Sequence, residues 1–129
     1  MELAEQILGV LAGFPEISVT ILFGSAASNR LTPVSDIDIG VAAVRILALE
    51  RKMELHTALS LALPREVDLV DLQAVNGPIL QQALSRGVLL KSSPPVYAAL
   101  IRKMWFNQAD MMPLTRMILQ RQTRRFVNG

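Results

Sequence analysis

The sequence predicts an α/β (α+β) fold, in which a small mixed sheet has helices packed on one side. Two observations lead to this prediction. Stretches with apolar residues at helical spacing alternate along the chain with short stretches rich in β-branched residues. The chain has 129 residues and no internal repeat, which is the size of one domain with one core. We therefore expect a single domain over residues 1–129, with a helical C-terminal segment over residues 93–129.

The first half of the chain is expected to form two helices and two strands. A first helix, ending near Gly13, is predicted by the spacing of apolar residues in ELAEQILGVLAGF. A buried strand is predicted for ISVTILF, which is rich in β-branched residues. A turn and the start of a short helix lead to a second strand, DIDIGVA, which alternates carboxylates with apolar residues. A second helix is predicted over residues 44–63, where Pro64 stops it.

The second half begins with a third strand, predicted for EVDLVDL. A third helix is predicted for NGPILQQALSRG, with Pro78 in its first turn and Gly87 near its C-cap. The next residues, VLLK, are short enough for a fourth strand at the edge of the sheet. Two helical stretches follow, SSPPVYAALIRKMWFNQ and PLTRMILQRQTRRF, with a break expected at Pro113.

The composition limits the class of protein. The sequence contains no cysteine, which excludes a disulfide framework and a thiolate metal site. No uncharged stretch is long enough for a membrane span. The N-terminal residues include Glu2 and Glu5 and lack the basic leader of a secretory signal. We therefore expect an intracellular, cytoplasmic protein without a membrane contact.

The net charge of +2 conceals an asymmetry between the halves of the chain. Residues 1–71 include ten acidic and five basic residues, whereas residues 72–129 include one acidic and eight basic residues. Such a basic C-terminal part could contact an acidic protein face, or it could be a solvated helix end. We do not expect direct nucleic-acid binding, because no aromatic residues are interleaved with the arginines.

Two carboxylates at alternate positions of an apolar strand require a partner. Asp36 and Asp38 share one face of the predicted second strand, and a charge there costs free energy unless it is paired. Mg²⁺ is bound by one or two carboxylates together with water and phosphate oxygens. Asp68, on the predicted third strand, could complete this site from the side, whereas the alternation of the strand puts Asp71 on the opposite face.

The residues Gly24 and Ser25 follow the first strand directly and could hold a phosphate. Glycine allows a sharp turn there, and Ser25 offers a hydroxyl group together with the backbone N–H groups of a helix start. A nucleoside triphosphate could then lie between this turn and the carboxylates.

The combination of these motifs resembles a known superfamily. The pattern is Gly24-Ser25, then ten residues, then Asp36-Ile37-Asp38, and a third acidic strand about thirty residues later. It resembles the DNA polymerase beta-like nucleotidyltransferases, and most closely their minimal nucleotidyltransferase (MNT) group. The segment EVDLVDLQAVNGPILQQALSRGVLLKS extends the resemblance, which covers residues 17–92. The resemblance implies a nucleotidyltransferase fold like the palm of polymerase beta.

The resemblance also implies roles for individual residues. Gly24 and Ser25 would contact the triphosphate of ATP, and Asp36 and Asp38 would be ligands of two Mg²⁺ ions. Asp68 would be the third carboxylate, which ligates the catalytic metal and helps to activate the attacking hydroxyl group. The turn departs from the family pattern, because it reads GSAASN where members often read GSxARG.

The same resemblance implies a biological role. Stand-alone members of the MNT group are antitoxins that pair with a HEPN-domain toxin and transfer AMP from ATP to a tyrosine of that toxin. The chain would then be a magnesium-dependent protein adenylyltransferase. Two alternatives stay open at this point: a non-catalytic antitoxin that neutralises its HEPN partner by binding alone, and transfer to a small molecule or an RNA end.

Overall fold

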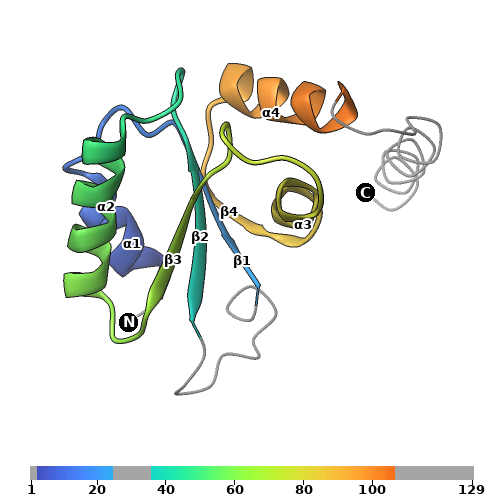
Figure 1. Ribbon diagram of the computed structural model, residues 1–129. Coiled ribbons are helices and arrows are strands. Elements are labelled where there is room, and N and C mark those ends of the chain that lie inside the picture. Colours follow the sequence, from blue (N-terminus) through green and yellow to red (C-terminus); the bar gives the residue numbers. More distant parts are fainter. Residues whose placement is uncertain (1–2, 25–35, 107–129) are drawn as a thin grey trace.

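A computed structural model describes residues 3–24 and 36–106. Four helices and four strands follow one another along the chain (Figure 1): α1 (Leu3–Leu11), β1 (Val19–Phe23), β2 (Ile37–Ala42), α2 (Leu49–Ala62), β3 (Val67–Asp71), α3 (Pro78–Arg86), β4 (Val88–Lys91) and α4 (Pro94–Phe106). The expected helix over PLTRMILQRQTRRF and the break at Pro113 lie outside the described residues.

The strands form one mixed sheet in the order β3-β2-β1-β4. β1 is antiparallel to β2 and to β4, whereas β2 and β3 are parallel. The predicted fold class and the position of β4 at an edge are therefore confirmed. Within the described residues β3 is the other edge strand, which becomes important below.

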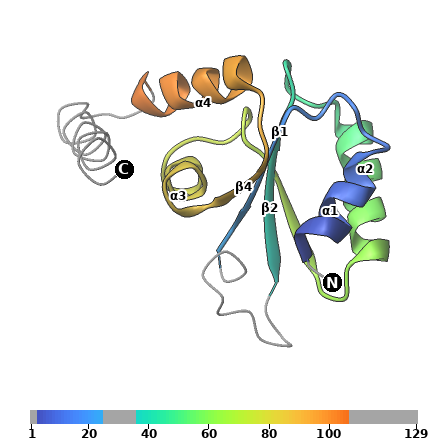
Figure 2. The same cartoon turned by 180° about the vertical axis from the view of Figure 1, so that it is seen from behind.

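Helices cover both faces of the sheet, so the expectation that they pack on one side was wrong. α1 and α2 lie on one face, and α3 and α4 lie on the other (Figures 1 and 2). The reason is that all five residues of β1 are buried, and a strand with apolar side chains on both faces needs cover on both. The first face contributes Leu22, Ile37, Ile39, Val41, Val67 and Leu69 to one core cluster. The second contributes Val19, Ile21, Phe23 and Ala42 to another.

The second helix begins at Leu49, five residues later than the sequence suggested. Residues 44–48 form a loop instead, and the Asp71 carboxylate accepts a hydrogen bond of 2.9 Å from the backbone N–H of Leu47 in this loop. Ala48 has an extended backbone (φ −62°, ψ 146°), and its carbonyl accepts the first helical hydrogen bond, from the N–H of Lys52. A contact between distant parts of the chain therefore prevents the apolar residues of this loop from extending the helix.

A cation joins α2 to the connection between α1 and β1 on the first face. Arg51 of α2 stacks its guanidinium 4.1 Å from the ring centroid of Phe14 and forms an ion pair with Glu16. Both partners lie in the connection between α1 and β1. None of the helices in residues 3–24 and 36–106 is both long enough and apolar enough to cross a bilayer.

Candidate functional site

The site is built around two aspartates on neighbouring parallel strands. Asp38 is the second residue of β2, and its partner in the register of the sheet is Asp68, the second residue of β3. Because side chains alternate along a strand and the residues beside them, Ile37 and Val67, face the α1–α2 core, both carboxylates face the other side. The alternation read from the sequence is thus confirmed. The register, which the sequence does not give, brings the two acids together.

The two carboxylates influence each other. Partial burial and, after it, the charge of Asp68 and a hydrogen bond with it raise the pKa of Asp38, and the charge of Asp36 adds to this effect. Two carboxylates held together in this way favour a bound proton or a cation. The arrangement is therefore suited to a divalent ion, which prefers oxygen ligands and would relieve the repulsion.

Gly24 lies against this pair. Its φ of +70° belongs to the left-handed region, and a Cβ at this position would overlap Oδ2 of Asp38 and lie 3.1 Å from its Cγ. Only glycine fits both the backbone conformation and the space beside the carboxylate. Gly24, directly after β1, and Asp38 on β2 are therefore in close contact.

The other predicted site residues, Asp36 and Ser25, are not part of this close pair of carboxylates. Asp36 is exposed and directly precedes β2, where it adds to the repulsion on Asp38. In the described ranges no three acidic or histidine side chains converge closely enough to enclose a metal ion. The structure therefore unites Asp38 and Asp68 and leaves Asp36 as an outlying acid. Ser25 lies outside the described residues.

Asp71, the competing choice for the third acid, has a different environment. It is only 3 % exposed and lies at the end of β3 far from Asp68. Its two oxygens accept hydrogen bonds from the backbone N–H groups of Leu47 and Gln73, each 2.9 Å long. Asp71 therefore holds two loops in place, and Asp68 is the acid that faces Asp38.

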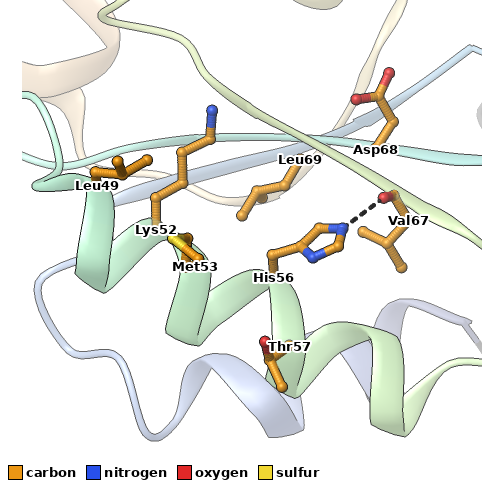
Figure 3. A pocket seen from close by; sticks show the side chains of 8 residues that line it. All are labelled: Leu49, Lys52, Met53, His56, Thr57, Val67, Asp68 and Leu69. Atoms are coloured by element: carbon orange, nitrogen blue, oxygen red, sulfur yellow. Dashed lines mark hydrogen bonds between the residues drawn. The ribbon is translucent and has the colours of Figure 1, made fainter.

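A cavity of about 370 Å³ opens beside Asp68, between α2 and β3 (Figure 3). Its lining residues are Leu49, Lys52, Met53, His56, Thr57, Val67, Asp68 and Leu69. His56 Nε2 lies 3.0 Å from the carbonyl oxygen of Val67, so α2 is tied to the edge strand next to Asp68. No motif in the sequence predicts this cavity; the available signal is that α2 carries apolar residues on a second, exposed face in addition to the face that it buries.

The fold and the acid pair define a nucleotidyl-transferring class of protein, and the sequence comparison agrees. Residues 5–95 match the family described as Polymerase beta, Nucleotidyltransferase. The chain belongs to this family.

Within this family, the chain is similar to a protein adenylyltransferase and to chains of toxin–antitoxin structures. The protein adenylyltransferase MntA of Shewanella oneidensis is 37% identical over 73 residues, which are 57% of this chain and 52% of that protein. The chain thus matches about half the length of this relative. A crystal structure of a toxin–antitoxin with AMP-PNP is similar with a TM-score of 0.69 and 25% identity, over 98% of this chain and 97% of that one. A chain of the complex between tri-AMPylated Shewanella oneidensis HEPN toxin and MNT antitoxin is similar with a TM-score of 0.61 and 26% identity, over 96% and 90%.

Proposed function

We propose that this protein transfers AMP from ATP to a tyrosine hydroxyl group of a HEPN-domain toxin in the cytoplasm, and that it acts in this way as the antitoxin. The observation that carries the proposal is the carboxylate pair Asp38–Asp68 beside the Gly24 turn. The relatives support it, because one is named a protein adenylyltransferase and another is an MNT antitoxin in complex with an AMPylated HEPN toxin.

The acids would hold magnesium. Asp38 and Asp68 provide adjacent carboxylates, and Asp36 adds negative charge at the edge of the site. Magnesium, when bound, supplies the positive charge that stabilises the negative charge developing on the phosphoryl oxygens and on pyrophosphate. Because Gly24 has no Cβ, the Asp38 carboxylate lies directly against it, and a triphosphate held at the turn that continues into Ser25 would be next to the magnesium ligands.

The acceptor reaction then needs a base and a leaving group. Asp68 is exposed on the edge strand, where it can accept the proton of the tyrosine hydroxyl group. The tyrosine oxygen forms a bond to the α-phosphorus of ATP while the bond from that phosphorus to the pyrophosphate oxygen breaks. The products are AMP-tyrosine, pyrophosphate and the proton held by Asp68.

The experiment measures the intact mass of a candidate HEPN-domain toxin, tested first as the product of the adjacent gene, after incubation with this protein, ATP and Mg²⁺. We expect a gain of one or more adenylyl units, which disappears with the Asp36→Asn/Asp38→Asn variant. No gain, with the two proteins still forming a tight complex, would contradict transfer and support neutralisation by binding alone. An adenylyl gain on a small molecule or an RNA end without the partner would point to the second alternative, transfer to such an acceptor.

A further inference from the structure

We propose that the cavity between α2 and β3 is the docking site of the acceptor protein. An apolar side chain of that protein enters the cavity while its chain passes over β3, an edge strand of the described sheet, and brings the reacting hydroxyl group to Asp68. This inference rests on the proposed function, and it adds the surface by which the partner is recognised. The four apolar residues of the cavity, which we call the α2–β3 cavity set, are Leu49, Met53, Val67 and Leu69.

The order of the strands places the proposed nucleotide site and the proposed acceptor site at different positions across the sheet. Gly24 directly follows β1, Asp38 lies on β2 and Asp68 lies on β3. These strands are neighbours in the order β1-β2-β3. The phosphate turn and the cavity are therefore on opposite sides of Asp38. A triphosphate at Gly24 leaves the outer side of Asp68 free, and an acceptor can reach this acid from beyond the edge strand.

The cavity has the character of a protein contact. Leu49 and Met53 are 71% and 59% exposed, although the same helix already buries Leu55 and Leu59 in the core. The fold itself uses one apolar face of α2 and leaves this second one open to solvent. Exposed apolar side chains gathered around a cavity next to a reactive group are typical of an interaction site.

The contact is expected to use side chains and not an added strand. The carbonyl oxygen of Val67, at the open edge of β3, is already hydrogen-bonded to His56. A partner strand could not pair with the edge at this position without displacing that histidine. Figure 3 shows Asp68 projecting from the side of β3 opposite to Val67 and Leu69, so the partner must reach around the edge.

The charge of the cavity rim specifies the chemistry of the partner further. Lys52 is half-buried and lines the cavity together with the apolar set. A carboxylate of the partner placed beside its apolar anchor would pair with this ammonium group. We therefore infer an anchor that is aliphatic or aromatic and has an acidic neighbour.

The test combines truncation of the exposed apolar residues with a matched control. The double variant Leu49→Ala/Met53→Ala opens the cavity without adding charge, and alanine is compatible with the helix. The control is Leu61→Ala, which truncates an 85% exposed leucine of the same helix that does not line the cavity. Thermal unfolding verifies that both variants are folded. The measurements are the Kd for the HEPN-domain partner without nucleotide, the Kd for MgATP, and the KM for the partner in AMP transfer.

We expect the double variant to bind the partner about tenfold more weakly and to raise its KM to a similar extent. The affinity for MgATP should stay within about twofold of the wild type, because the cavity is on the other side of the acid pair. The control should match the wild type in all three measurements. The change Lys52→Glu should weaken the complex as well, because it reverses the charge at the rim.

Three results would overturn the docking proposal. Unchanged partner affinity in the double variant would show that the acceptor docks elsewhere, and a weaker MgATP affinity would show that the cavity holds the nucleotide base. Loss of self-association in gel filtration, with partner binding intact, would assign the cavity to a second copy of the chain. If the double variant bound the partner more weakly but the wild type transferred no AMP, the docking site would be retained and the proposed function rejected.

Discussion

Asp38 and Asp68 are register partners on the parallel strands β2 and β3, and the charge of Asp68 acts directly on Asp38. The arrangement opposes folding, because two like charges are held together while one of them is partly buried. Such pairs are found where a cation or a proton is used in chemistry. The predictions below start from this relationship.

The acid pair makes stability depend on pH. The pKa of Asp38 is raised in the folded state, so its contribution to stability is present below the ordinary pKa of an aspartate and is lost as the pH rises through the raised value. Asp38→Asn should therefore be more stable than the wild type at pH 7 without Mg²⁺, and this advantage should disappear at acidic pH. The melting temperature measured from pH 3 to 8 tests this. The control is Glu66→Gln, which removes an exposed carboxylate directly before β3. It should not show the stability advantage at pH 7 that disappears at acidic pH.

Magnesium should stabilise the folded protein through the same pair. A ligand that binds only the folded state adds about 2.7 kcal/mol when its concentration is about 100 times its Kd. We expect the melting temperature of the wild type to rise with Mg²⁺ and that of Asp38→Asn/Asp68→Asn to stay constant. An equal rise in both proteins would place the metal elsewhere. Addition of EDTA should reverse the effect.

Changing Asp68 to asparagine should affect AMP transfer, whereas changing Asp71 to asparagine should affect the stability of the fold. Asp68→Asn should reduce AMP transfer by about 100-fold or more without loss of stability, because it removes charge from the reaction site. Asp71→Asn should destabilise the fold by about 1–3 kcal/mol, since a buried carboxylate accepts two backbone hydrogen bonds. Its transfer rate per folded molecule should change only slightly. Denaturant unfolding and AMP transfer measured on the same samples distinguish the two residues.

Gly24 offers a test with an internal control. Gly24 and Gly77 have nearly the same φ, +70° and +69°, but a Cβ at Gly77 would meet nothing within 4 Å. Gly77 combines this φ with a ψ of −137°, a conformation that residues with a side chain rarely adopt, so Gly77→Ala should show backbone strain alone, about 1–3 kcal/mol. Gly24→Ala should reduce AMP transfer as well as stability, because its methyl group displaces the Asp38 carboxylate, whereas Gly77→Ala should leave the transfer rate of the folded protein unchanged. Equal losses of stability with full activity in both variants would show that the contact with Asp38 is unimportant.

His56 should act as a positioning residue for the edge strand. Its ring nitrogen contacts the carbonyl oxygen of the residue that precedes Asp68. His56→Leu should cost about 0.5–1.5 kcal/mol and should lower kcat for AMP transfer more than it raises the KM for ATP. His56→Gln, which retains a donor, should restore part of the rate. If both variants lost the same stability and kept the wild-type kcat, the contact would be structural only.

Several features could be predicted from the sequence because they depend on local periodicity. The alternation in DIDIGV and EVDLVDL placed Asp38 and Asp68 on the face opposite to their apolar neighbours, and it separated Asp68 from Asp71. The edge strand β4 was evident from its length. The start of α2 could not be predicted in this way, because the hydrogen bond from Leu47 to Asp71 joins residues 24 positions apart.

Patterns within single segments were enough to predict the types and the order of the described elements, and to select Asp36, Asp38, Asp68 and the Gly24 turn as candidates for the site. The packing of separate segments sets which strands are neighbours, places helices on both faces of the sheet, and makes Asp38 and Asp68 register partners. It also decided that Leu49 and Met53 surround a cavity beside the acid pair. These properties depend on how separate segments pack, and no periodicity within one segment contains that information.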